Sequence, residues 1–230
     1  MDALLLSLRL ALYVSVILLL GGLPLAYWLA FTKWRGKFLL EAVVAMPLVL
    51  PPTVLGFYVL LAMGPRGPLG QFWQAIFGHG LAFTFEGLVI ASVLYSLPFA
   101  VQPLIASFEA VDSKLIDASA VLGARRLKTF WRVILPLSIP GVVTALVLSF
   151  AHTMGEFGVV LMVGGNLAGV TRTISIAIYD QVQSLDYGEA NRMALVLLAI
   201  SFSVLCVVYA VNRQVGRQTV RRLWTPWTTN

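Results

Sequence analysis

Residues 10–31 read LALYVSVILLLGGLPLAYWLAF, and these 22 consecutive positions contain no Asp, Glu, Lys, Arg or His. A helix of about 20 apolar residues crosses a hydrocarbon core of roughly 30 Å. A charged side chain at the centre of such a helix costs about 2.5–3.5 kcal/mol, so the absence of charge indicates a membrane-spanning segment. The stretch is longer than the apolar part of a signal peptide and its positive charges follow it, so we expect a span.

The same pattern recurs four times along the chain. Apolar residues make up 59% of the 230 residues and charged residues 11%, whereas soluble domains hold about 45–50% and about 25%. These values exclude a disordered chain, a nucleic-acid-binding domain and an ordinary soluble enzyme. We predict an all-α polytopic membrane protein with about five transmembrane helices, and we treat residues 1–230 as a single transmembrane domain. The further uncharged runs are residues 42–63, 87–108, 133–151 and 193–211.

Positive charge is distributed unevenly between the two sides that alternating spans would define. Segments 32–41, 109–132 and 212–230 together hold twelve Lys and Arg, whereas the segments on the other side hold four. The positive-inside rule places the twelve in the cytoplasm, which predicts an outside N-terminus and a cytoplasmic C-terminus. The net charge of +6 is then explained by membrane topology, and the lipid bilayer rather than nucleic acid is the expected partner.

Prolines interrupt several of the uncharged runs, most severely at residues 50–53, which read LPPT. Each internal proline removes a helical hydrogen bond and frees the carbonyl four residues earlier. In a membrane, that carbonyl must be satisfied by protein or by a water-filled cavity. The break is therefore either a packed kink or part of a helix that lines a pathway. The residues that we select as pathway candidates are Pro51, Pro52, Thr53, Tyr58, Gln102, Gly155 and Glu156.

Signatures of catalysis and of metal binding are missing from the sequence. It contains no G-x-x-x-x-G-K-[ST] phosphate-binding loop, no H-E-x-x-H and no G-x-S-x-G, and its only cysteine is Cys206. We therefore predict no catalytic residue, no metal site and no bound cofactor. Because the uncharged runs offer no carboxylate for proton or sodium coupling, energy for uphill transport would enter from another subunit. A membrane-embedded enzyme and a non-transporting scaffold are the alternatives of a different class.

Segment 109–132, between the third and fourth runs, has the pattern of a short amphipathic helix. Asp112 is placed to cap the helix N-terminus, and Leu115, Ala118 and Leu122 recur on one face. Gly123 is placed to end the helix. A short helix presented at the membrane surface in this way can dock in a groove of a partner protein.

The same segment resembles the loop signature of ABC importer permeases. That signature reads E-A-A, three residues, G, nine residues, I, one residue, L-P, and here residues 117–123 read DASAVLG and residues 133–136 read VILP. The departures are Asp117, Ser119 and Val133, all conservative. In that family the loop forms a coupling helix that inserts into a cytoplasmic ATPase subunit. The resemblance implies ATPase contacts from Leu115, Asp117, Ala118, Ser119, Leu122 and Gly123.

A second resemblance covers nearly the whole chain. Residues 47–58 read PLVLPPTVLGFY, residues 155–158 read GEFG, residues 164–166 read GGN and residues 171–173 read TRT. This set is similar to the molybdate-type branch of ABC importer permeases, and sulfate and thiosulfate permeases share parts of it. The resemblance implies a type I ABC importer permease fold in a bacterial cytoplasmic (inner) membrane. It also implies a permease homodimer, a cytoplasmic ABC ATPase and an extracytoplasmic oxyanion-binding protein.

Glu156 is unexpected in a pathway for an anion, because an ionised carboxylate would repel the substrate. We therefore expect it to have a structural partner, such as Arg172 or a backbone N–H, rather than to be a direct ligand. Gly155 and Gly158 are expected to allow a close approach of backbones. Because the uncharged runs carry no Lys or Arg, we expect tight anion binding on the separate binding protein and only weak binding here.

Overall fold

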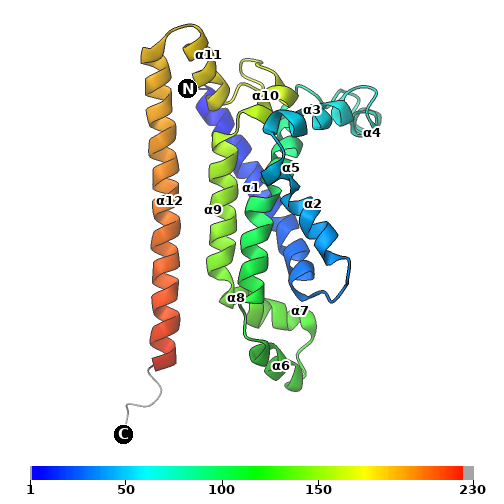
Figure 1. Cartoon of the computed structure of the whole chain (residues 1–230), viewed down its shortest axis with the longest axis vertical. Coiled ribbons are helices and arrows are strands. Elements are labelled where there is room, and N and C mark those ends of the chain that lie inside the picture. The colour runs from blue at the N-terminus through cyan, green and yellow to red at the C-terminus, as the bar shows by residue number, and fades with distance from the viewer. Residues whose placement is uncertain (1, 225–230) are drawn as a thin grey trace.

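The computed structural model describes residues 2–224, and every regular element in that range is a helix (Figure 1). The single domain predicted for residues 1–230 therefore includes residues 1 and 225–230, which lie outside the described residues. The elements are α1 (Asp2–Phe31), α2 (Lys37–Val49), α3 (Pro52–Met63), α4 (Pro68–Phe77), α5 (Phe85–Glu109), α6 (Ser113–Val121), α7 (Arg126–Thr129), the π-helix η1 (Phe130–Ile134), α8 (Leu135–Leu137), α9 (Ile139–Gly155), α10 (Gly158–Gly164), α11 (Ile174–Gln183) and α12 (Tyr187–Trp224).

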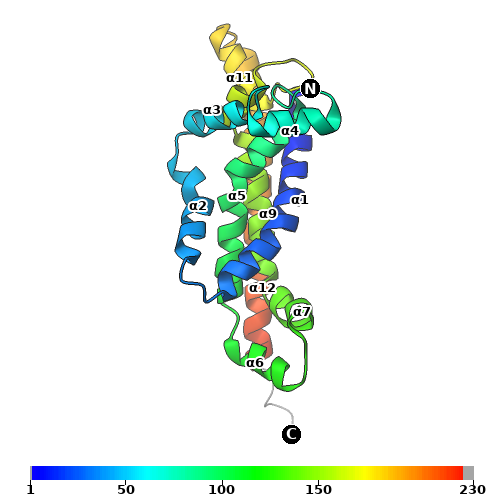
Figure 2. The same ribbon diagram turned by 90° about the vertical axis from the view of Figure 1, so that its right-hand side faces the viewer.

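Helices α1, α5 and α9 pack together as the centre of the molecule (Figures 1 and 2). On α1 the buried positions recur every three or four residues, as in Leu10, Val14 and Leu18, and form one stripe. The opposite positions are also apolar but exposed, including Leu12 and Leu20. A helix that is apolar on all sides and buried on only one is suited to face lipid with the rest.

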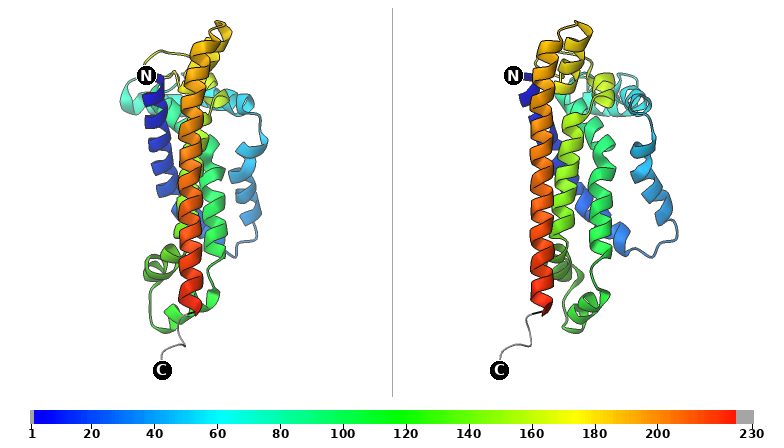
Figure 3. Two further views of the ribbon diagram at one scale, coloured as in Figure 1. Left: turned by 90° about the vertical axis from the view of Figure 1, so that its left-hand side faces the viewer. Right: turned by 60° about the vertical axis from the view of Figure 1, so that its left-hand side comes forward.

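Within residues 2–224, three single helices are long and apolar enough to cross a membrane, namely α1, α5 and the Tyr187–Val207 part of α12. Two pairs of bent helices raise the number to five if each pair counts as one span. Helix α12 packs against α9 and α11 and lies at the side of the molecule (Figure 3). Within Tyr187–Val207, most apolar side chains are left uncovered by the chain, as expected for a helix surrounded by lipid.

The run at residues 42–63, predicted as one span, is divided into α2 and α3 with a bend of 113° between them. The break falls at Leu50, which is extended with φ −72° and ψ 137°. A residue that precedes proline is pushed out of the helical region, and here two prolines follow Leu50 in succession. The chain therefore resumes its helix at Pro52 in a new direction, and α3 lies across the end of the bundle instead of continuing along it (Figure 2).

The second bend, of 73°, joins the segment from α7 to α8 with α9. The bend is at Ser138, which is fully buried, and it follows a π-helical turn and Pro136. Two reciprocal hydrogen bonds hold it against α5: Ser138 Oγ donates to the Ser107 carbonyl at 3.2 Å, and Ser107 Oγ donates to the Ser138 carbonyl at 3.3 Å. Helix α9 consequently begins at Ile139, six residues after the predicted start of the fourth span.

The short helices lie at two opposite ends of the bundle (Figures 1 and 2). The start of α1 lies at the same end as α3, α4, α10 and α11, whereas α6 and α7 lie at the opposite end. At that opposite end Lys37 links three helices. Its Nζ lies 3.4 Å from Glu41 Oε1 and 3.5 Å from Glu109 Oε1, and it donates to the Leu29 carbonyl at 3.3 Å.

Helices α3 and α10 cross closely, and glycine makes this crossing possible. A Cβ added at Gly56 would lie 2.8 Å from Met162 Cβ and 3.2 Å from the backbone of Val159, while one at Gly158 would lie 2.7 Å from Pro52 Cβ. Close approach was predicted for Gly155 and Gly158, and it is confirmed only for Gly158. A Cβ at Gly155 would meet nothing within 4 Å.

We expect Gly56→Ala to destabilise the protein by about 1–3 kcal/mol, the usual effect of adding a methyl group to a packed interior. Gly21→Ala is the matched control, because its Cβ would meet nothing within 4 Å and alanine favours a helix by about 1 kcal/mol over glycine. The measurement is the thermal unfolding midpoint of each purified variant in detergent. Equal midpoints for the two variants would contradict the close crossing of α3 and α10.

Candidate functional site

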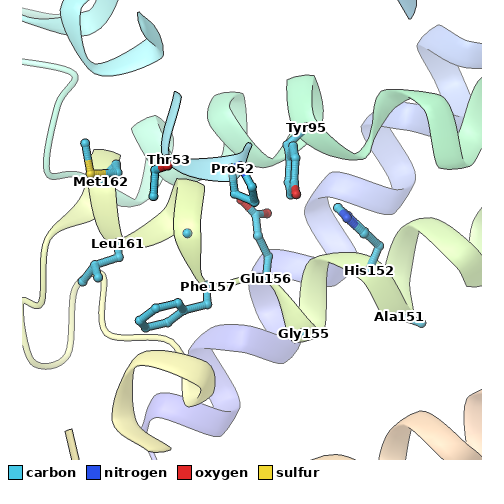
Figure 4. Close-up of a pocket in the computed structure, with 11 residues that line it drawn as sticks. Pro52, Thr53, Tyr95, Ala151, His152, Gly155, Glu156, Phe157, Leu161 and Met162 are labelled. Atoms are coloured by element: carbon cyan, nitrogen blue, oxygen red, sulfur yellow. The ribbon is translucent and has the colours of Figure 1, made fainter. Parts of the chain in front are cut away.

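A pocket of about 610 Å³ opens where the first turn of α3, the middle of α5 and the junction of α9 with α10 meet (Figure 4). It lies toward the end of the bundle that holds the start of α1. Its lining is mostly apolar, with hydroxyl, imidazole and carboxyl groups interspersed. The lining residues are Pro52, Thr53, Tyr95, Ala151, His152, Gly155, Glu156, Phe157, Gly158, Leu161 and Met162.

The junction between α9 and α10 places Glu156 in this pocket. Helix α9 ends at Gly155, and Glu156 follows in an extended conformation with φ −66° and ψ 135°. The chain resumes its helix at Gly158, so that α10 runs beside α3. The first turn of α3, at Pro52 and Thr53, and the α9–α10 junction, at residues 155–158, therefore line the same pocket. The Glu156 carboxyl is directed toward Pro52 and Tyr95 (Figure 4).

Glu156 is a buried acid with no counter-ion among the described residues. Its side chain is 5% exposed, and neither carboxyl oxygen has a hydrogen-bond partner within residues 2–224. Burial raises the pKa of this carboxyl, which lies beyond the last residue of α9, to about 8, and the nearby Ser92 hydroxyl offsets the rise only in part. Ser92 Oγ also lacks a hydrogen-bond partner in the described chain. The Ser92 hydroxyl and the Glu156 carboxyl are therefore neighbours that do not meet the geometry of a hydrogen bond. Burial therefore favours the protonated form of Glu156.

His152 and Tyr95 form the other polar part of the pocket. His152 Nδ1 lies 3.0 Å from Ser96 Oγ, which lies 3.1 Å from Thr153 Oγ1. The imidazole also stacks on Phe99, with ring centroids 3.9 Å apart. Our selection of pathway residues from the sequence omitted Tyr95 and His152. The signal that could have identified this face of α5 is the pair of serines at positions 92 and 96, four residues apart in an otherwise apolar run.

The pocket brings together some of the predicted pathway residues and leaves out others. Pro52, Thr53, Gly155 and Glu156 line it. The remaining candidates do not contribute to the lining: Pro51 precedes α3, Tyr58 is 65% exposed farther along α3, and Gln102 is exposed about two turns beyond Tyr95 on α5.

The expected pairing of Glu156 with Arg172 is wrong. Arg172 Nε donates to Asn166 Oδ1 at 2.6 Å and lies 3.6 Å from Asp180 Oδ2. Asn166 Nδ2 in turn donates to the Asp180 carboxylate at 2.7 and 2.9 Å. Asp180 lies on α11. The position of this helix next to Arg172 was not predicted from the sequence.

At the opposite end of the bundle, α6 has the local structure predicted for segment 109–132 (Figure 1). Asp112 caps the helix by accepting from the Lys114 N–H at 2.9 Å. Gly123 follows the helix with φ +75°, the left-handed conformation that favours glycine. Apolar side chains remain uncovered on α6, with Val121 89%, Leu122 86% and Leu115 48% exposed. Asp117 and Ala118 are also exposed.

Ser119 differs from its neighbours on α6, because its hydroxyl is engaged within the chain. It donates to the Ile116 carbonyl at 2.8 Å and lies 2.8 Å from Thr129 Oγ1, on α7. Thr129 is buried at 6% exposure. The Ser119 side chain therefore connects α6 to α7, whereas Leu115, Leu122 and Val121 are free to contact another protein.

Residues 22–219 match the family described as binding-protein-dependent transport system inner membrane component. This chain belongs to that family of transport permeases, and it is a multi-pass protein of the inner membrane. Among its relatives, the molybdenum transport system permease protein ModB of Azotobacter vinelandii is 50% identical over 213 residues, which cover 93% of this chain and 94% of that protein. The sulfate transport system permease protein CysT of Salmonella typhimurium is 33% identical over 199 residues, covering 86% and 72%.

The fold is that of type I ABC importer permeases. One similar structure is the crystal structure of a bacterial alginate ABC transporter in complex with an alginate pentasaccharide-bound periplasmic protein. A chain of that structure has a TM-score of 0.74 at 17% identity, and the match covers 93% of this chain and 78% of that chain. A chain of the MetNI methionine ABC transporter, in an inward-facing conformation, has a TM-score of 0.71 at 17% identity, with coverage of 93% and 94%.

Proposed function

We propose that this chain is the permease subunit of an ABC importer that moves molybdate across the bacterial cytoplasmic membrane. The observation that carries this proposal is the 50% identity to a molybdenum permease over 93% of the chain. The substrate alternative is sulfate or thiosulfate, but identity to the sulfate permease is lower, at 33%. ATP hydrolysis takes place on a partner subunit, since the sequence has no phosphate-binding loop of its own.

Helix α6 is the proposed docking site for a cytoplasmic ABC ATPase. Support comes from the loop signature at residues 117–136 and from the exposed apolar side chains of Leu115, Val121 and Leu122. Asp117, Ala118 and Gly123 complete the contact surface, and Ser119 contributes by holding α6 against α7. Helix-in-groove docking uses such apolar anchors on a short helix. Two copies of the permease would each receive one ATPase subunit.

The pocket at the other end of the bundle is the proposed start of the substrate pathway. An extracytoplasmic oxyanion-binding protein would deliver the anion at this end, where the N-terminus lies outside the cell. The lining residues of the described pocket include no Lys or Arg, which supports weak and transient contact with the anion. Pro51, Tyr58 and Gln102 remain candidates for the pathway of the paired permease.

The test of the proposal is ATP hydrolysis by the permease reconstituted with its ATPase and binding protein. We expect molybdate-loaded binding protein to stimulate hydrolysis, and sulfate-loaded binding protein to have little effect. Stimulation by sulfate alone would assign the chain to the sulfate branch. The absence of stimulation by either anion, in a complex that assembles, would favour a scaffold or a membrane-embedded enzyme.

A prediction for α6 follows from the positive φ of Gly123. We expect Gly123→Val to uncouple ATP hydrolysis from transport, because a β-branched residue in the left-handed conformation costs about 1–2 kcal/mol and shifts the turn. Such a cost corresponds to roughly a tenfold change in the population of the turn. Gly123→Asn is the matched control, since asparagine tolerates this conformation. Equal stimulation of hydrolysis in the two variants would contradict the importance of this turn for coupling.

The proposed orientation can be tested with alkaline phosphatase, which is active only outside the cytoplasm. We expect a fusion after Arg66, in the loop between α3 and α4, to be active, and a fusion after Lys37, at the start of α2, to be inactive. The two positions flank the bent pair α2 and α3, so the comparison also tests whether this pair brings the chain across the membrane. The reverse pattern would overturn the orientation, and equal activities would show that the pair does not cross.

A further inference from the structure

The pocket at the α9–α10 junction combines two features that conflict in an anion pathway. It contains a carboxyl group, Glu156, and its lining residues in the described chain include no Lys or Arg to neutralise that group. Hydroxyl donors are present, because Thr53 of α3 and Tyr95 of α5 line the same pocket (Figure 4). An ionised carboxylate has only acceptors to offer, whereas a protonated one has an O–H donor. The charge of Glu156 therefore decides whether the pocket can hold an anion.

We propose that Glu156 keeps its proton while the oxyanion crosses the pocket, and that its O–H donates a hydrogen bond to an oxygen of the anion. This inference rests on the proposed function, since it concerns the same substrate and the same pathway. Thr53 and Tyr95 supply the other hydroxyl donors. The proton stays on the carboxyl throughout, so that no proton is carried with the anion and no net charge is added to the transported species.

Burial and the missing partners of Glu156 support this assignment. The side chain is 5% exposed, and both its oxygens lack a hydrogen-bond partner among the described residues. A carboxylate that is buried and unpaired is unstable relative to its neutral form, because desolvation penalises the charge. The O–H of a protonated Glu156 has no acceptor among the described residues, so this donor is available to a ligand that brings an acceptor. A tetrahedral oxyanion has only acceptor oxygens, which makes it complementary to this donor.

The groups around Glu156 do not supply the charge that would ionise it. The titratable side chains that line the pocket with it are Tyr95 from α5 and His152 from α9, whereas α3 and α10 contribute none. His152 is already engaged with Ser96 through Nδ1. Arg172, the cation that the sequence suggested as a partner, is paired with Asp180 instead. Burial raises the pKa of Glu156 to about 8, so the proton is lost only as the external pH rises through that value.

The first experiment measures uptake of radioactive molybdate into proteoliposomes that contain the complete importer, at a constant internal pH. For the wild type we expect the rate to fall about tenfold between an external pH of about 7 and about 9, which is the change in protonated fraction of a group with a pKa of about 8. Glu156→Gln keeps a donor that does not titrate. We expect this variant to be a few-fold slower at pH 7 and to lose the fall at high pH.

Glu86→Gln is the matched control, because Glu86 is an exposed carboxylate at the start of α5, at the same end of the bundle. We expect this variant to keep both the wild-type rate and the wild-type pH profile. Three results would overturn the proposal: an unchanged pH profile in Glu156→Gln, the absence of transport by that variant in an assembled complex, or a wild-type rate for Glu156→Ala. Saturation of the binding protein with molybdate is measured at each pH, so that delivery of the substrate is held constant.

A second measurement does not depend on transport. Infrared difference spectra of the wild-type complex and Glu156→Gln should contain the carbonyl band of a protonated carboxyl at pH 7, and this band should fall about tenfold by pH 9. Added molybdate should shift the band, because the hydrogen bond weakens the carboxyl C=O bond. A wild type that transports molybdate but has no protonated band would overturn this inference alone. A complex whose ATPase responds to neither anion, but whose carboxyl band is present, would instead contradict the proposed function.

Discussion

Backbone hydrogen bonding inside a bilayer is the constraint on which the rest of this structure depends, because hydrocarbon offers no partner to a free N–H or C=O. Every regular element that the chain forms within residues 2–224 is accordingly a helix. At residues 50–51 the break redirects α3 onto α10, where Gly56 and Gly158 allow close packing. At Ser138 the break is pinned to α5 by two reciprocal hydrogen bonds.

The Ser138 bend and the junction at Glu156 lie at the two ends of α9. Helix α9 begins at the Ser138 bend, beside the segment that leads from α6, and ends next to Glu156 in the pocket. Its 17 residues span about 25 Å at 1.5 Å per residue. The chain therefore leads from α6 through α7, η1 and α8 into α9, and along α9 to the junction that shapes the pocket. Ser119 and Thr129 strengthen this connection by tying α6 to α7.

Local features were predictable from the sequence because they depend on neighbouring residues. The Asp112 cap, the helix end at Gly123 and the break at residues 50–51 all follow from the conformational preferences of single residues and their immediate neighbours. The uncharged runs predicted membrane helices for the same reason, since insertion depends on summed hydropathy. The predicted spans missed the large bend within the second run and the late start of α9, because packing sets the direction in which a broken helix resumes.

The pocket itself was decided by the tertiary structure. Pro52 and Glu156 are separated by more than 100 positions in the sequence, yet both line this pocket. They meet because α3 lies across the end of the bundle and α10 packs beside α3. Tyr95 and His152 join them from two other helices, while Tyr58 and Gln102 do not line the pocket. The sequence by itself determined a helical membrane protein with a capped helix between its third and fourth spans. Whether Glu156 is paired or alone, and hence which protonation state it adopts, depends on long-range contacts, because burial and partners are properties of the folded chain.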